Sequence, residues 1–345
     1  NKEIVKKILI EIKPEIKSVI NNKKINFIRD GLIDSFDIVR IIVEIDKIKK
    51  KEINPNKVHK RTFSTIETIS KLLRWLLNMK KYNKKNIIDS LKKVGLKSGQ
   101  IVYINPELFK FGSLYEAKNK NHYYKIFFDS IYEIIGKNGT LASNSYTFQT
   151  LRYGKKFIYE KTKCTSGEFS DYIRKKRGSL RSQHPVFSVT ALGKHKKYLC
   201  SNNSSHNYGY NSPYQRFLEL DGKVLNLAID PCFNPFLHVA EFLSGVPYFY
   251  NKLTKVNYYK NNKKVNKYFS SSVRYLDLDM KMKLNELKKL KRELIKKKVV
   301  KTANLGSSKI YFFSAKKYLN IVLKSLEKDQ FAFFKISNFK KNKMP

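Results

Sequence analysis

The spacing of hydrophobic residues divides this chain of 345 residues into two parts. In the first 80 residues, apolar side chains recur every three or four positions, which places them on one face of an α-helix. We expect helices at residues 2–20, about 25–48 and 63–78. The apolar stripes of the second and third helices are Ile38, Ile41, Ile42, Ile45 and Ile48, and Ile66, Ile69, Leu72, Leu73 and Leu76. Helices of this length in 80 residues predict a small all-α helical bundle.

The pattern changes after the basic segment 81–86, which we interpret as a linker. Short apolar runs such as "QIVYIN", "GTLASNSY", "VFSVTALG" and "KVLNLAID" now alternate with helical segments such as "YYKIFFDSIYEII" and "FLHVAEFLSG". This alternation predicts a layered α/β domain over residues 87–340, with a mixed sheet that helices mainly bury on both faces. Further along, "YYKNNKKVNKYFSSSVRYLD" indicates a hairpin around "KNNKK", and "MKMKLNELKKLKRELIKKK" indicates a basic amphipathic helix.

Composition changes this picture little. The formal net charge of +43 would attract polyanions. The lysines are spread along the whole chain, however, so we interpret most of them as solvated surface residues and expect no specific nucleic acid partner. Three widely spaced cysteines form neither a disulfide framework nor a metal-ligand pair, which favours a cytoplasmic location. No apolar run is long enough to span a bilayer, so we expect no membrane span.

A serine at a predicted helix start is the first candidate for chemistry. In "GLIDSFDIV", Asp34 can cap the helix that begins near Ser35. The free N–H groups and the positive end of the helix would then favour a phosphodiester esterified to Ser35. The simpler interpretation, an ordinary serine in the first turn, remains open at this point.

With its neighbouring helices, this stretch resembles an acyl carrier protein over residues 1–80. The resemblance implies that Ser35 carries a 4′-phosphopantetheine arm, attached by a phosphopantetheinyl transferase. One departure concerns the helix after the serine, which is usually acidic in that family. Here Asp37, Glu44 and Asp46 are followed by the basic run Lys47–Lys51, interrupted only by Ile48, so docking to ordinary fatty-acid enzymes is not expected.

Two segments of the larger part carry further candidate residues. "RGSLRSQHPVFS" contains Arg181 and the nearby hydroxyls of Ser182 and Ser188, which suit phosphate binding because arginine makes bidentate contacts. "NPFLHVAEF" places His238 and Glu241 three residues apart, on one helix face. A neutral histidine can remove a proton from an amine, provided that a carboxylate holds its tautomer.

Read in order, the segments "VGLKSGQIVYIN", "RSQHPVFSVTALG", "NSPYQRFLELDGKVLNLAID", "LHVAEFLSGVPY" and "VRYLDLD" resemble the aminoglycoside 3-N-acetyltransferase family over residues 84–336. The resemblance implies acetyl transfer from a coenzyme A thioester to an amine. It implies a catalytic set of His238 as general base, Asp279 as the carboxylate that orients it, and Glu241 and His184 in the site. It also implies that the coenzyme lies along Arg181, Ser182, Ser188 and the loop at Asn105.

Departures from the family pattern affect the walls of the site. Asn105-Pro106-Glu107 replaces the usual His-Ser-Ser, Ser143-Asn144 replaces Met-Pro, and Asp230 stands where a glycine is usual. The acceptor that the resemblance implies is an aminoglycoside or another amino-sugar, and these departures favour another amine, such as an amino-sugar, over the classical antibiotic.

The sequence thus predicts an N-acyltransferase that uses acetyl-CoA, another acyl-CoA or the arm on Ser35, and that transfers acyl groups other than amino-acyl groups. Its partner would be an amine-bearing small molecule, and a homodimer is one option. Two alternatives remain: a catalytically inactive basic scaffold that binds nucleic acid, and a carrier that serves a separate loading enzyme.

Overall fold

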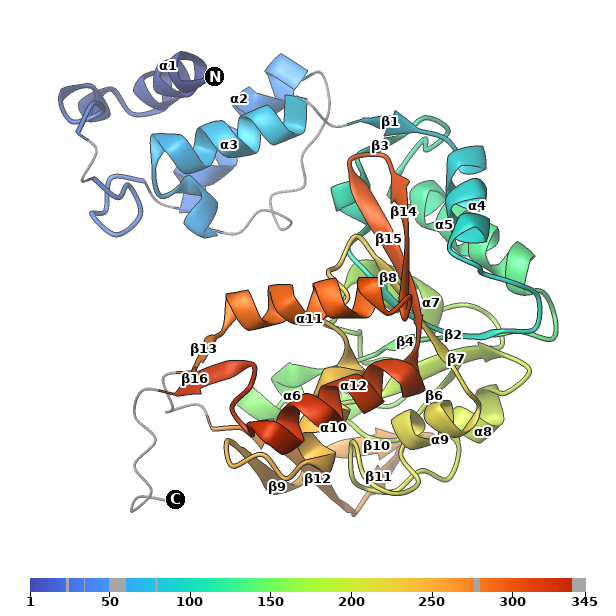
Figure 1. The fold of residues 1–345 in the computed structure, drawn as a ribbon. Helices are drawn as coiled ribbons and strands as arrows, with labels where there is room; N and C mark the ends of the chain where they lie inside the picture. Colours follow the sequence, from blue (N-terminus) through green and yellow to red (C-terminus); the bar gives the residue numbers. More distant parts are fainter. Residues whose placement is uncertain (23–24, 34, 50–59, 78–79, 276–279, 337–345) are drawn as a thin grey trace. The chain divides into compact units, whose positions relative to one another are not determined.

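The chain forms two compact units, residues 1–80 and 81–345. The computed structural model describes residues 1–22, 25–33, 35–49, 60–77, 80–275 and 280–336. Within these ranges, no helix is long and apolar enough to cross a membrane. Each unit is described by itself below (Figure 1).

Unit 1 is helical. The elements are α1 (Lys2–Ile12), the 3₁₀ turn η1 (Pro14–Ser18), α2 (Ser35–Lys49), the 3₁₀ turn η3 (Lys60–Phe63) and α3 (Ile66–Leu77). The helices share a core to which each contributes its apolar stripe, including Val5, Ile8, Leu9, Ile41, Ile42, Ile45, Ile69 and Leu73. Ile48, predicted to extend the stripe of α2, is instead exposed near the end of that helix.

Two predicted helices of unit 1 are shorter than expected. The first α-helix ends at Ile12 because Pro14 offers no N–H and its ring crowds the preceding turn. The second begins at Ser35, as predicted from the Asp34-Ser35 stretch, rather than near residue 25, as the apolar period alone suggested. The segment before it forms turns, in which the Asn26 side-chain oxygen accepts the backbone N–H groups of Ile28 and Arg29 at 3.2 and 3.0 Å. Such local bonds compete with helix formation.

Unit 2 is built on a mixed, seven-stranded sheet with the order β14-β15-β8-β2-β4-β7-β6. Only the central pairs β2–β4 and β2–β8 are parallel, and the other pairs are antiparallel. The strands are β2 (Ile101–Pro106), β4 (Thr140–Asn144), β6 (Leu180–Arg181), β7 (Val189–Gly193), β8 (Lys223–Leu227), β14 (Val300–Leu305) and β15 (Ser308–Ser314). Strands β14 and β15 form one edge of this sheet, and the sequence pattern did not predict them.

Helices cover both faces of the sheet, as the predicted burial of the strands requires (Figure 1). Alternate side chains of one strand enter different cores: Tyr103 packs on one side, while Val102 and Ile104 pack on the other. One face carries α4 (Lys84–Lys93), α5 (Lys120–Ile135) and α7 (Glu168–Arg174). The opposite face carries α8 (Lys196–Cys200), α9 (Pro213–Glu219), α10 (Pro235–Leu243), α11 (Leu284–Lys296) and α12 (Ala315–Lys328).

Smaller elements complete unit 2. The antiparallel ribbon of β9 (Phe249–Lys255) and β12 (Tyr268–Arg274) lies beyond α10 in the chain. The predicted hairpin is formed by β10 (Tyr258–Lys260) and β11 (Lys263–Val265), and Asn261 and Asn262 adopt the positive φ that a two-residue turn needs. The others are α6 (Phe148–Tyr153), η4 (Leu108–Phe111), β1 (Lys81–Tyr82), β3 (Ser113–Leu114), β5 (Phe157–Ile158), β13 (Met280–Met282) and β16 (Phe334–Ile336).

Candidate active site

A pocket of about 660 Å³ opens in unit 2 between α10, α6 and the β9–β12 ribbon. Its walls are mostly aromatic, and its polar groups are an imidazole, the hydroxyls of one serine and four tyrosines, and two cationic side chains. The lining residues are Tyr146, Phe148, Leu151, Tyr153, Phe187, Tyr208, His238, Phe249, Tyr250, Lys252, Ser272, Val273 and Arg274. Pockets of this size with few convergent polar groups are typical of small-molecule sites.

His238 reaches this pocket from the first turns of α10. That helix begins after Asn234, whose side-chain oxygen accepts the N–H of Phe236 at 2.9 Å, and Pro235 occupies the first helical position. The imidazole of His238 is partly exposed, whereas Glu241, one turn later, is fully buried. The His238 Nδ1 lies 2.6 Å from Glu241 Oε2. With Nδ1–H donating to the carboxylate, Nε2 keeps its lone pair available for a proton.

Three donors hold the Glu241 carboxylate. Besides His238, Arg274 Nη2 donates to both carboxylate oxygens, at 2.9 and 3.2 Å, and the Tyr248 hydroxyl donates to Oε1 at 3.1 Å. Burial alone would raise the pKa of Glu241. The attraction of His238 and Arg274 and their hydrogen bonds outweigh burial, so the pKa of Glu241 lies below its ordinary value. Glu241 is therefore ionised and can stabilise a positive charge on His238.

Arg274 and Tyr248 were missed by the sequence reasoning. Arg274 lies on β12, 33 residues after Glu241, and stacks over the ring of Phe334 at 4.1 Å. Its only signal was its place in "VRYLDLD", the segment that also supplied Asp277 and Asp279. Both aspartates lie outside the described residues, so the orienting role of Asp279 stays a prediction. In the described part of the chain, Glu241 is the carboxylate that contacts His238.

His184, which the resemblance placed in the site, lies outside the pocket lining. Its ring is buried, and Nδ1 accepts the backbone N–H groups of Val186 and Phe187 at 3.2 and 3.0 Å. The other ring nitrogen, Nε2, lies 3.1 Å from the carbonyl oxygen of Ser270, to which it donates. Burial lowers the pKa of His184 to about 4. His184 does not line the pocket, and these contacts join the turn before β7 to strand β12.

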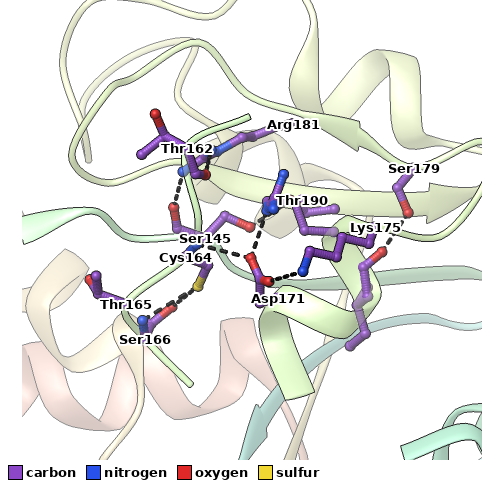
Figure 2. A network of polar contacts seen from close by, with 12 residues as sticks. Ser145, Thr162, Cys164, Thr165, Ser166, Asp171, Lys175, Ser179, Arg181 and Thr190 are labelled. Atoms are coloured by element: carbon purple, nitrogen blue, oxygen red, sulfur yellow. Dashed lines mark hydrogen bonds and ion pairs between the residues drawn. The ribbon is translucent and has the colours of Figure 1, made fainter. Parts of the chain in front are cut away.

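The predicted phosphate-binding group makes hydrogen bonds inside the protein, and Figure 2 shows Arg181 within this polar network. Arg181 is buried and donates to the carbonyl oxygens of Thr162 (2.8 Å) and Ser145 (2.6 Å) and to the hydroxyl of Ser188 (2.8 Å). Burial lowers the pKa of Arg181 to about 10. Ser182 is also buried, and its hydroxyl accepts the N–H of Val189 at 2.9 Å. None of Arg181, Ser182 and Ser188 lines the pocket, so their predicted contact with the coenzyme stays a prediction.

Asn105 connects the sheet to the start of helix α10, which carries His238. At the end of β2, its amide donates to the carbonyl oxygen of Phe233 at 2.7 Å. Asn226, its register partner on β8, donates to the same carbonyl at 3.3 Å and to that of Asp230 at 3.0 Å. The Asp230 carboxylate in turn pairs with Lys291 of α11 at 2.6 Å. These contacts hold the loop from which α10 starts.

Comparison with known proteins agrees with this architecture. Residues 112–327 match the aminoglycoside 3-N-acetyltransferase family. No curated protein sequence matches the chain significantly. Among solved structures, the aminoglycoside acetyltransferase AAC(3)-Xa is similar with a TM-score of 0.62 at 18% identity, over 75% of this chain and 96% of that one.

Two further structures are similar over nearly their whole length. AAC-IIIb, in a binary complex with coenzyme A, has a TM-score of 0.61 at 18% identity and covers 72% of this chain and 97% of its own. AAC-VIa bound to sisomicin has a TM-score of 0.59 at 19% identity and covers 72% of this chain and 98% of its own. At such identities these likenesses show the fold. The family match covers more than half of the chain, and the chain therefore belongs to the aminoglycoside 3-N-acetyltransferase family.

Proposed function

We propose that unit 2 transfers an acyl group from a coenzyme A thioester to an amine of an aminoglycoside or another amino-sugar, with His238 as general base. One observation carries the proposal: His238 faces a pocket of about 660 Å³ while its Nδ1 lies 2.6 Å from the buried Glu241. Two of the similar structures support this choice of donor and acceptor. AAC-IIIb is bound to coenzyme A, and AAC-VIa is bound to sisomicin.

The residues suggest how the reaction proceeds. His238 Nε2 removes a proton from the amine as its nitrogen attacks the thioester carbonyl, and the ionised Glu241 stabilises the resulting imidazolium. A carbon–nitrogen bond forms and the carbon–sulfur bond breaks. The proton on His238 then passes to the leaving thiolate, which regenerates the neutral base. Arg274 and Tyr248 keep the carboxylate in place through these steps.

The test is release of free thiol from acetyl-CoA in the presence of a panel of amino-sugars and aminoglycosides. We expect His238→Ala to lower kcat by about 10²- to 10⁴-fold, the range of general base catalysis. His195→Ala, a change of a half-buried histidine at the start of α8 that does not line the pocket, serves as the matched control and should keep the wild-type rate. Equal rates in wild type and His238→Ala would contradict the assignment of the base.

For unit 1, we propose an acyl carrier with 4′-phosphopantetheine on Ser35. The support is the backbone: α2 begins at Ser35, so the free N–H groups of its first turn lie beside this residue. The acidic Asp37 in that turn is paired with Lys13 at 3.0 Å, which reduces its repulsion of a phosphodiester. When bound, the group would supply a thiol for acyl attachment, and the carrier could present the acyl group to His238 in place of coenzyme A.

Intact mass after co-expression with a phosphopantetheinyl transferase tests the carrier. We expect a mass increase of one phosphopantetheine in the wild type and none in Ser35→Ala. Ser18→Ala, a change of an exposed serine in η1, is the control and should be modified normally. An unmodified wild type would contradict the carrier function and leave the coenzyme A reaction untouched. Equal acyl transfer by loaded wild type and Ser35→Ala would instead identify free acyl-CoA as the donor.

A further inference from the structure

We propose that the acceptor is an anionic amino-sugar, in which the ring that bears the reacting amine also carries a phosphate or carboxylate held by Lys252. This inference rests on the proposed acyl transfer at His238 and goes further by naming the class of acceptor. Its basis is the charge and the wall chemistry of the pocket.

The described walls offer no carboxylate to a polycation. Among the residues described as lining the pocket, none is Asp or Glu. Among the carboxylates that the structure describes, Glu241 contacts His238, but it is fully buried and already accepts hydrogen bonds from His238, Arg274 and Tyr248. An aminoglycoside carries several ammonium groups, and each would lose hydration without gaining an opposite charge from these walls.

The uncompensated charge at these walls is positive. Arg274 is neutralised by Glu241, and His238 must be neutral to act as a base. Lys252, on the exposed side of β9, forms no ion pair with a carboxylate among the residues that the structure describes. An ammonium of the substrate about 4 Å from Lys252 would be repelled by about 1–4 kcal/mol, depending on solvent exposure, and an anion at that distance would be attracted by a similar amount.

The aromatic walls of the pocket suit a sugar ring whose amine lies at His238 and whose anion lies at Lys252. Phe249 lies beside the base, with its ring centroid 6.2 Å from that of His238. Tyr250 stacks on Tyr275, with centroids 4.6 Å apart, which holds its ring rigidly in the wall. Lys252 lies two residues after Tyr250 on β9, so these two side chains share one face of the strand, about 7 Å apart. Both line the pocket that His238 enters, and the C–H face of a sugar ring packs well on aromatic side chains such as Tyr250.

A comparison of acceptors tests the proposal. With acetyl-CoA as donor, kcat/KM is measured for glucosamine 1-phosphate, muramic acid, glucosamine and kanamycin, which supply a phosphate, a carboxylate, no anion and a polycation. We expect the two anionic acceptors to exceed glucosamine by about 10-fold or more, and kanamycin to be the poorest. The better of the two anionic acceptors identifies whether phosphate or carboxylate is preferred.

The matched variants are Lys252→Glu and Lys255→Glu, two exposed lysines of β9 of which only Lys252 lines the pocket. In Lys252→Glu, the ratio of kcat/KM for the preferred anionic acceptor to that for glucosamine should fall about 10- to 100-fold, as expected when a charge-assisted contact is reversed. Binding of glucosamine 1-phosphate, measured by calorimetry without acyl donor, should weaken in parallel. Lys255→Glu should leave both quantities at wild-type values.

Two results would overturn the inference, and they are distinguishable. If kanamycin is the best acceptor, or if both lysine variants change the ratio equally, the anionic acceptor is wrong while acyl transfer stands. If no acceptor is acetylated, the proposed acyl transfer itself fails, and the class of acceptor fails with it.

Discussion

Two histidines of unit 2 have opposite surroundings, although the sequence suggested a catalytic role for both. His238 has one ring nitrogen on a buried carboxylate and the other toward a pocket. His184 has both nitrogens on backbone groups and is 3% exposed. The comparison shows that the partner of each nitrogen decides what a histidine can do. A carboxylate on one side and open space on the other suit the general base that we propose, whereas backbone groups on both sides make a structural crosslink.

The largest effect should come from breaking the contact that distinguishes His238. In Glu241→Gln, the amide keeps the size of the side chain but removes the negative charge that stabilises the imidazolium. We expect kcat for acyl transfer to fall about 10²- to 10³-fold, as measured by thiol release at saturating acetyl-CoA. A rate within about threefold of wild type would show that another carboxylate orients the base, and Asp279→Asn would then be the variant to test.

The pH dependence of stability should reveal His184. Its pKa is about 4 in the folded protein and 6.5 ordinarily, so the unfolded chain binds more protons between these values. Stability is therefore highest above pH 6.5 and is lost as the pH falls toward 4, by on the order of 3 kcal/mol. Chemical denaturation of wild type and His184→Gln at several pH values measures this difference. Parallel pH profiles for the two proteins would contradict the buried, neutral histidine.

Two arginines of unit 2, Arg274 and Arg181, differ in the same way as the two histidines. Arg274 binds a carboxylate beside the pocket, but Arg181 binds carbonyl oxygens and a hydroxyl inside the protein. Arg181→Lys should lose part of this network and lower the free energy of unfolding by about 1–3 kcal/mol, with KM for acetyl-CoA unchanged. If KM for acetyl-CoA instead rises 10-fold or more without loss of stability, Arg181 binds the coenzyme as the sequence predicted.

The smallest effect concerns the third donor to Glu241. Tyr248→Phe removes one hydroxyl and leaves His238 and Arg274 on the carboxylate. We expect kcat to fall less than about 10-fold, because one hydrogen bond contributes about 1–2 kcal/mol. A loss as large as that of Glu241→Gln would mean that the hydroxyl itself takes part in the reaction.

Local sequence patterns were sufficient for much of the fold and for the centre of the site. The i, i+3 spacing of His238 and Glu241 placed them together because one helical turn brings such residues to the same face. Alternating strands and helices likewise predicted the covered sheet. The Asp34-Ser35 stretch predicted the start of α2 correctly. The apolar period alone placed it near residue 25, because a periodic pattern does not reveal the turn bonds of Asn26.

Contacts between distant segments could not be predicted in the same way. Arg274 reaches Glu241 only because the ribbon folds back over α10, and no spacing in the sequence records that approach. The burial of Arg181 was missed for a related reason. Its hydrogen-bond partners come from segments as far as 36 residues away. The local sequence, an arginine near serines, is the same whether the guanidinium faces a ligand or a backbone carbonyl.

Strand β12 contributes both to the wall of the pocket, through Ser272 and Val273, and to the clamp on Glu241, through Arg274. In the evolution of this enzyme, a substitution on β12 that admits a new acceptor therefore also disturbs the proposed catalytic pair of His238 and Glu241, and most such changes would be selected against. Strand β9 supplies wall residues without a described contact to Glu241. Diversification of acceptor preference among related enzymes should accordingly concentrate on β9.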